Sequence, residues 1–161
     1  MSIAEFRERM NIALPHQAEV RVWLKELGCE VSGFDYLVDI PKEVRRQLGW
    51  LRWLPEFVCS RHDTGLFYAD AKCENGQHQN FSVEQEALAA YLRLAEIENH
   101  QTVLVFPGRM ACSAVYWDAT AEKQIRTNTD SGSGTPYRLM AKNLTHPLDE
   151  VLKSLWLLGA A

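Results

Sequence analysis

Two strand-like runs separated by a short turn lie between residues 54 and 73, and they constrain the fold more than any other segment. The first run is LPEFVCS, the connector is RHDTG, and the second run is LFYADAKC. Alternating side chains on both sides of a turn that contains glycine predict an antiparallel hairpin. Because successive strand residues point to opposite faces, Tyr68, Asp70 and Lys72 share one face of the second strand. The other face of that strand carries small and apolar residues, so we expect it to face the core.

The polar face of this hairpin contains the residues of a candidate metal site. On the first strand Glu56 shares a face with Val58 and Ser60, and pairing across the turn brings Glu56 close to Asp70. Carboxylates supply the oxygen ligands that Mg²⁺ prefers, and the metal accepts phosphate oxygens as further ligands. A lysine beside them can orient a water molecule or stabilise developing negative charge. This face therefore predicts phosphoryl chemistry at a metal ion. The alternative without a functional site is a solvated strand face on which Asp70 and Lys72 form a surface ion pair.

Helices are predicted before and after the hairpin. Residues 2–12 are expected to be helical, with Ser2 as cap, and a second helix is expected after Pro15, ending at Gly28. A short helix is expected after Pro41, ending at Gly49. The second of these helices is predicted by apolar residues at i, i+3, i+4 and i+7, namely Val20, Trp23, Leu24 and Leu27.

The segments after the hairpin complete an α/β pattern. Ser82 and Gln85 have the spacing of a capping box, which predicts a helix continuing through EQEALAAYLRLAEIE. TVLVF is expected to be a buried strand, SAVYWDA and YRLMA are further strand candidates, and Pro147 opens a C-terminal helix. This order predicts a single domain over residues 1–161, with helices on a central mixed β-sheet.

Composition excludes several classes of protein. The 161-residue chain has a net charge of −4, so a nucleic-acid partner must be met by a local basic patch. Four cysteines lack the spacing of a zinc site, and we expect free thiols in a reducing compartment. The start, MSIAEFRERM, lacks the apolar core of a signal peptide, and no apolar run is long enough to span a bilayer. These features predict a cytoplasmic protein.

The hairpin residues also carry a resemblance to a known family. Pro55-Glu56 followed by Asp70-Ala71-Lys72 resembles the signature of the PD-(D/E)xK nucleases, with a separation of 14 positions from the first acid to the second. That family has a core of helix, hairpin, helix and strand, an order that this sequence predicts over residues 17–106. The arrangement is similar to Holliday-junction resolvases and some restriction endonucleases. The resemblance implies a restriction-endonuclease-like fold, although the family usually has Asp where this chain has Glu56.

The resemblance also implies roles for individual residues. Glu56, Asp70 and the backbone carbonyl of Ala71 would bind Mg²⁺ or Mn²⁺, and Lys72 would be the catalytic lysine. The family often adds a Glu on the first helix, and Glu19 matches that position, acting on the metal directly or through a water molecule. The implied activity is an endonuclease that hydrolyses DNA phosphodiester bonds with a metal-activated water.

Other surfaces leave alternatives open. The arginines and lysine of KEVRRQLGWLRW suit phosphate contacts, whereas its tryptophans slightly favour the core; the candidate DNA-binding residues are Lys42, Arg45, Arg46 and Arg52. The loop Ser131–Pro136 offers backbone amides but matches no nucleotide-binding motif, and a connector is the preferred interpretation. Glu84 and Gln85 are assigned to helix capping before any site role.

Two questions about function and assembly also stay open. A homodimer through the apolar C-terminal helix is plausible, since two chains provide two sites for two strands, but that helix can equally pack on its own sheet. The alternative function is a nuclease fold with a weak or silent site that binds nucleic acid or a protein partner, an interpretation that Glu56 and the acidic net charge favour.

Overall fold

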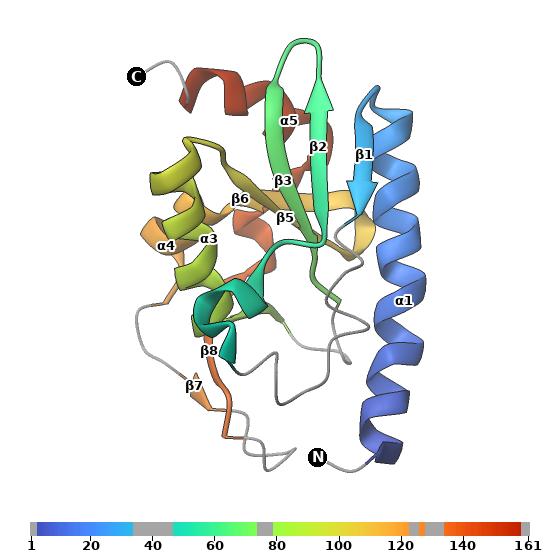
Figure 1. Cartoon of the computed structure of the whole chain (residues 1–161), viewed down its shortest axis with the longest axis vertical. Helices are drawn as coiled ribbons and strands as arrows, with labels where there is room; N and C mark the ends of the chain where they lie inside the picture. The colour runs from blue at the N-terminus through green and yellow to red at the C-terminus, as the bar shows by residue number, and fades with distance from the viewer. Residues whose placement is uncertain (1–2, 34–46, 74–78, 123–125, 128–133, 159–161) are drawn as a thin grey trace.

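A computed structural model describes residues 3–33, 47–73, 79–122, 126–127 and 134–158 (Figure 1). The helices are α1 (Ile3–Glu26), α3 (Gln85–Glu98), α4 (Ala114–Thr120) and α5 (Leu148–Leu158), with short 3₁₀ turns η2 (Gly49–Trp53), η3 (Pro107–Arg109) and η4 (Lys142–Leu144). The strands are β1 (Glu30–Gly33), β2 (Phe57–Arg61), β3 (Gly65–Ala71), β4 (Asn80–Glu84), β5 (Thr102–Phe106), β6 (Met110–Ser113), β7 (Arg126–Thr127), β8 (Pro136–Ala141) and β9 (His146–Pro147).

The strands of the described segments form two sheets. The larger has the order β1-β2-β3-β5-β6-β9, with β3 and β5 parallel and the other pairs antiparallel. Between β3 and β5 the chain passes through β4 and α3, the type of crossover that a parallel pair requires. The smaller sheet, β4-β8-β7, is antiparallel. The predicted central mixed sheet flanked by helices is confirmed, and the second sheet is an addition that the sequence pattern did not predict.

Apolar clusters lie on both faces of the larger sheet. Phe67 and Ala69 of β3 pack in one cluster with residues of α1 and α5, such as Leu24 and Leu152. The second cluster joins β5 to α3, α4 and the smaller sheet through buried residues that include Leu104. Figure 1 shows α1 beside β1, and α3 and α4 away from it on the other side of the sheet. The predicted apolar face of the hairpin is therefore part of the core.

The first helix is longer than predicted. We expected separate helices before and after Pro15, but α1 continues through Pro15. A proline in a helix interior forfeits one backbone hydrogen bond, and here the buried side chains of Val20 and Leu24 anchor the helix beyond it. Its predicted end is confirmed. Gly28 has φ +81° and donates its N–H to Lys25 O, while the next residue donates to Leu24 O, which is the Schellman pattern.

Two local predictions were wrong. SAVYWDA forms not a strand but α4, because the Ser113 hydroxyl accepts a hydrogen bond from Tyr116 N and caps a helix there. Ser82 does not cap α3; it lies within β4, and the helix begins at Gln85 after Glu84. The end of that helix at Glu98 is as predicted.

The C-terminal helix packs on its own sheet. Leu152 and Leu155 are buried in the cluster with α1, so the described part of its apolar face is used within the chain. Cys29, Cys59, Cys73 and Cys112 are all free, as expected. Within the described ranges, no helix combines the length and hydrophobicity needed to cross a bilayer.

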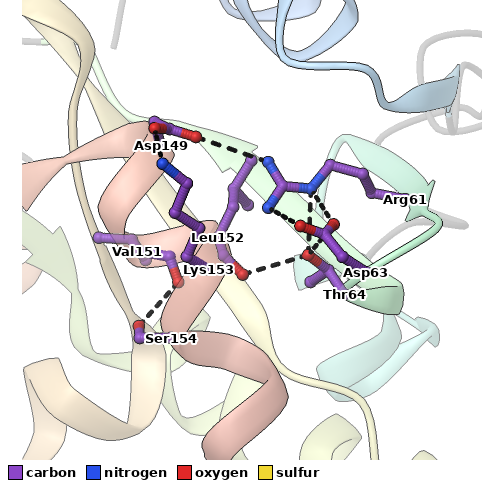
Figure 2. A network of polar contacts seen from close by, with 8 residues as sticks. All are labelled: Arg61, Asp63, Thr64, Asp149, Val151, Leu152, Lys153 and Ser154. Atoms are coloured by element: carbon purple, nitrogen blue, oxygen red, sulfur yellow. Dashed lines mark hydrogen bonds and ion pairs between the residues drawn. The ribbon is translucent and has the colours of Figure 1, made fainter.

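The turn of the β2–β3 hairpin is tied to α5 by polar contacts (Figure 2). The Arg61 guanidinium contacts Asp63 in the turn and Asp149 on α5, at 2.5 and 3.7 Å. Thr64 Oγ1 donates a hydrogen bond to the Leu152 carbonyl of α5 at 3.2 Å. These contacts fix the closed end of the hairpin, and the polar residues that the sequence singled out lie at its other end.

Candidate active site

Glu56 lies immediately before β2, at the open end of the hairpin. Its Oε2 accepts a hydrogen bond of 2.9 Å from the backbone N–H of Ala71, at the end of β3. Its Oε1 accepts a hydrogen bond from the Gln17 side chain of α1. The strand register, with Phe57 opposite Ala69, places Glu56 beside the end of β3, as the sequence predicted. Two elements far apart in sequence therefore orient this carboxylate.

Asp70 and Lys72 lie on the neighbouring strand and contact each other. Asp70 is only 3% exposed. Lys72 Nζ lies 2.8 Å from Asp70 Oδ2, close enough for an ion pair. The contact lacks hydrogen-bond alignment, so this buried oxygen has no directed donor. Lys72 Nζ also lies 5.5 Å from the centre of the Tyr91 ring of α3. An acid, an ammonium and an aromatic ring are thus packed together with little exposure to solvent.

The surroundings of Glu56 disfavour the ionised form of its carboxyl group. Burial, together with the nearby negative charge of Asp70, raises the pKa of Glu56 to about 8. Burial alone would lower the pKa of Lys72, but the negative charge of Asp70, with smaller contributions from Tyr91 and Glu84, holds it well above its usual value. The second carboxylate is thus not fully compensated by the lysine, and a divalent cation would offset its charge.

Glu84 is a residue of this cluster that the sequence interpretation assigned only to capping. It makes no side-chain capping bond at the start of α3. Its Oε2 instead accepts a hydrogen bond of 3.4 Å from Lys72 Nζ. No sequence signal linked positions 72 and 84, because the spatial contact depends on β4, which was not predicted.

Glu19 does not reach this cluster in the structure. Its side chain is 63% exposed and lies 3.8 Å from His16 Nδ1. The residue of α1 that contacts Glu56 is Gln17, not the expected Glu19. Positions 17 and 19 lie about 200° apart around a helix, so they cannot face the same site. Gln17, Val20 and Leu24 have the i, i+3, i+7 spacing of the buried stripe, a signal that could have identified Gln17.

The candidate DNA-binding residues are only partly described. Lys42, Arg45 and Arg46 lie outside the described residues, and Arg52 lies in η2 without a described side chain. Residues 131–133 of the Ser131–Pro136 loop are also outside them, and Pro136 begins β8.

The tryptophans of η2 pack against α3. Trp53 Nε1 donates to Glu86 Oε2 at 3.1 Å. The guanidinium of Arg93 lies 5.1 Å from the centre of the Trp50 ring. These contacts agree with a packing role for the two tryptophans, which the sequence slightly favoured over base stacking.

The residues present fit a magnesium-type ion. Two carboxylates lie near each other, and a buried oxygen of one of them lacks a directed donor. Both oxygens of Glu56 accept one hydrogen bond each, which leaves further lone pairs available. Among the described residues, however, no three His, Cys, Asp or Glu side chains are clustered as a ready metal cage. A cation held here would rely on two carboxylates, backbone oxygen and water, a common donor set for Mg²⁺.

The fold belongs to the restriction-endonuclease-like class. No family model matches the sequence, and no curated protein matches it. Among solved structures the chain is similar to Hjc, a Holliday junction resolvase from the archaeal hyperthermophile Archaeoglobus fulgidus. The similarity has a TM-score of 0.53 and covers 87% of this chain and 94% of that chain, with 12% sequence identity. This similarity establishes a nuclease-like fold.

Proposed function

We propose that this protein is a metal-dependent endonuclease that hydrolyses phosphodiester bonds of DNA. One observation carries the proposal: Glu56, Asp70 and Lys72 meet at the open end of a hairpin within a restriction-endonuclease-like fold. The PD-(D/E)xK signature by itself is short. The signature is stronger evidence here because strand pairing brings its residues together, where Asp70 is buried and the ionised form of Glu56 is disfavoured.

Asp70, Glu56 and the carbonyl of Ala71 would hold Mg²⁺ or Mn²⁺. When bound, such an ion makes a coordinated water a better nucleophile and stabilises charge on the phosphate. The Ala71 N–H and the Gln17 amide hold the Glu56 carboxylate in one orientation. Lys72, charged at all working pH values, presents an ammonium to the attacking water or the phosphate oxygens. Glu19 lies on a different face of α1 from Gln17, beside His16, and has no role in this proposal.

DNA is the substrate that the family resemblance favours. Four-way junctions are included among the substrates to be tested because Hjc is a Holliday junction resolvase. The basic segment Lys42, Arg45, Arg46 and Arg52 would contact phosphates on the same molecule. With one site per chain, cleavage of two strands would be simplest for a homodimer.

The experiment is cleavage of labelled duplex, single-stranded, flap and four-way-junction DNA with Mg²⁺ or Mn²⁺. Asp70→Asn and Lys72→Met preserve side-chain size and should each abolish cutting, whereas Glu96→Gln, on the exposed surface of α3, should cut as the wild type does. Circular dichroism would confirm that every variant is folded. Failure of folded wild type to cut any of these DNAs, or cutting that survives both substitutions, would overturn the proposal.

A second candidate function is a silent nuclease fold that binds nucleic acid or a protein partner. Two features favour it: Glu56 stands where the family usually has Asp, and the chain has a net charge of −4. A competent site should raise the melting temperature when divalent metal is added, because the ion binds only the folded state. DNA binding without cleavage, and without any metal-induced shift, would support this second candidate.

A further inference from the structure

Lys72 lies between two carboxylates that make different contacts with it. Asp70 Oδ2 is nearer, at 2.8 Å, but no donor is directed at that oxygen. Glu84 Oε2 is farther, at 3.4 Å, and accepts a hydrogen bond from Lys72 Nζ. In the metal-free protein Lys72 Nζ therefore makes its closer ion pair with Asp70 and a longer hydrogen bond with Glu84, so both carboxylates hold the ammonium.

Glu84 reaches Lys72 from a junction between two elements. It is the last residue of β4, paired with Tyr137 of β8, and α3 begins at the next residue. Its backbone is extended, with φ −58° and ψ 133°, and its side chain makes no capping bond to the helix. A strand end held by the smaller sheet and a helix start together fix the Cα of Glu84, so the carboxylate is presented from a rigid base.

Tyr91 limits the movement of Lys72 from another direction. This tyrosine lies on α3 and is 2% exposed, and its ring centre is 5.5 Å from Lys72 Nζ. A cation near an aromatic face is attracted to it, and the attraction grows when water is excluded. Glu84 and Tyr91 therefore come from the same β4–α3 unit, while Asp70 comes from the strand that precedes Lys72.

We propose that Glu84 is the positioning residue of Lys72, holding its ammonium at the reacting phosphate while Asp70 serves as a metal ligand. This inference rests on the proposed nuclease function for its catalytic consequence. The reason is electrostatic. A metal ion bound to Asp70 would offset the negative charge of that carboxylate and weaken its attraction for Lys72. Glu84 would then be the carboxylate that still holds the ammonium. Glu84 is not itself placed on the metal or the substrate.

The test compares Glu84→Gln with Glu86→Gln. Both remove one negative charge near the start of α3, but Glu86 is exposed and accepts a hydrogen bond from Trp53. We expect kcat on the preferred DNA to fall by about 10²-fold in Glu84→Gln, the scale of misplacing a catalytic group. KM and the affinity for Mn²⁺ should stay within about threefold, and Glu84→Asp, which keeps the charge, should recover part of kcat. Glu86→Gln should resemble the wild type.

A second measurement does not depend on activity. The Nζ resonance of Lys72 in a ¹⁵N spectrum optimised for ammonium groups, assigned with Lys72→Met, reports the partners of this nitrogen in metal-free protein. Glu84→Gln should shift or broaden it, and Glu86→Gln should not. If wild type proves inactive, the nuclease proposal fails and this spectrum alone decides the placement of Lys72. An unchanged resonance, an unchanged kcat, or a rate loss fully explained by lost Mn²⁺ affinity would overturn the role of Glu84.

Discussion

Replacing Glu56 by glutamine is expected to stabilise the metal-free protein at pH 8 and to remove its stabilisation by Mg²⁺. The wild-type carboxyl has a pKa of about 8 in the folded chain, against an ordinary value of 4.5, because it is buried close to Asp70. Between these two pH values the folded state binds one more proton than the unfolded state, so stability falls as pH rises through this window. Lys72 adds nothing to this slope, since its raised pKa affects stability only at higher pH.

The magnitude follows from the size of that window. At about 1.4 kcal/mol for each pH unit, a pKa of about 8 instead of 4.5 corresponds to on the order of 5 kcal/mol at full ionisation. Glu56 is half-buried rather than fully buried, so solvent screens this cost, and we expect about 2–3 kcal/mol at pH 8. Glutamine keeps an oxygen for the Ala71 N–H, and the Gln17 amide can turn to accept from the new amide.

The assay is urea unfolding in EDTA at pH 5, 6, 7 and 8, followed by the fluorescence of the five tryptophans. Wild type should lose stability across the series, and Glu56→Gln should lose much less and be the more stable protein at pH 8. With Mg²⁺ at about 100 times its dissociation constant, wild type should gain about 2.7 kcal/mol and the variant much less. Parallel pH profiles for the two proteins in EDTA, or a variant less stable than wild type at pH 8, would refute the reasoning.

Three further predictions concern the scaffold and are measured by urea unfolding. Gly28→Ala should cost about 1 kcal/mol, because Gly28 has φ +81° and the cost is backbone strain, with no atom within 4 Å of an added Cβ; no loss would contradict the Schellman cap. Arg138→Ala should cost about 2–3 kcal/mol, since the buried Arg138 side chain donates hydrogen bonds to the carbonyls of residues 118 and 121. Asp118→Asn should cost under about 1 kcal/mol, because the Asp118 carboxylate that pairs with Arg138 is exposed. Equal losses in the two variants would contradict the larger role given to the carbonyl contacts. Phe106→Ala should cost about 3–5 kcal/mol, because this 1%-exposed ring stacks in the core, and a loss below about 1 kcal/mol would be inconsistent with that packing.

The hairpin was predictable because each of its signals is local. Phe67 and Ala69 alternate with Asp70, the connector contains turn residues, and both runs are of strand length. The observed register then follows from burial: a slip of one residue would bring Asp70 into the apolar cluster and expose Phe67. The pairing of Glu56 with the end of β3 is a consequence of that register, so the centre of the candidate site was also predictable.

The remaining parts of the site depend on contacts that no local pattern encodes. Gln17 is a neutral residue on a helix, and its meeting with Glu56 requires the angle at which α1 crosses the sheet. The capping-box spacing of Ser82 and Gln85, typical of a helix start, led to the assignment of Glu84 to helix capping. Ser82 instead lies within strand β4. That strand exists because it pairs with β8, more than fifty residues later in the chain, and pairing of this kind overrides local propensity.

The position of the candidate site follows from the two ends of the hairpin. At the closed end, Arg61 and Thr64 are tied to α5 (Figure 2), so the strands cannot slide past each other there. At the open end, the chain leaves β3 through Lys72, and the parallel strand β5 returns beside it, where Lys72 N bonds the Val105 carbonyl at 2.8 Å. The crossover that links these strands must pass over this end, and it brings Glu84 with it. The register and the crossover thus bring two carboxylates, Glu56 and Asp70, together with Lys72 and its second partner Glu84, and the proposed metal-assisted hydrolysis rests on this arrangement.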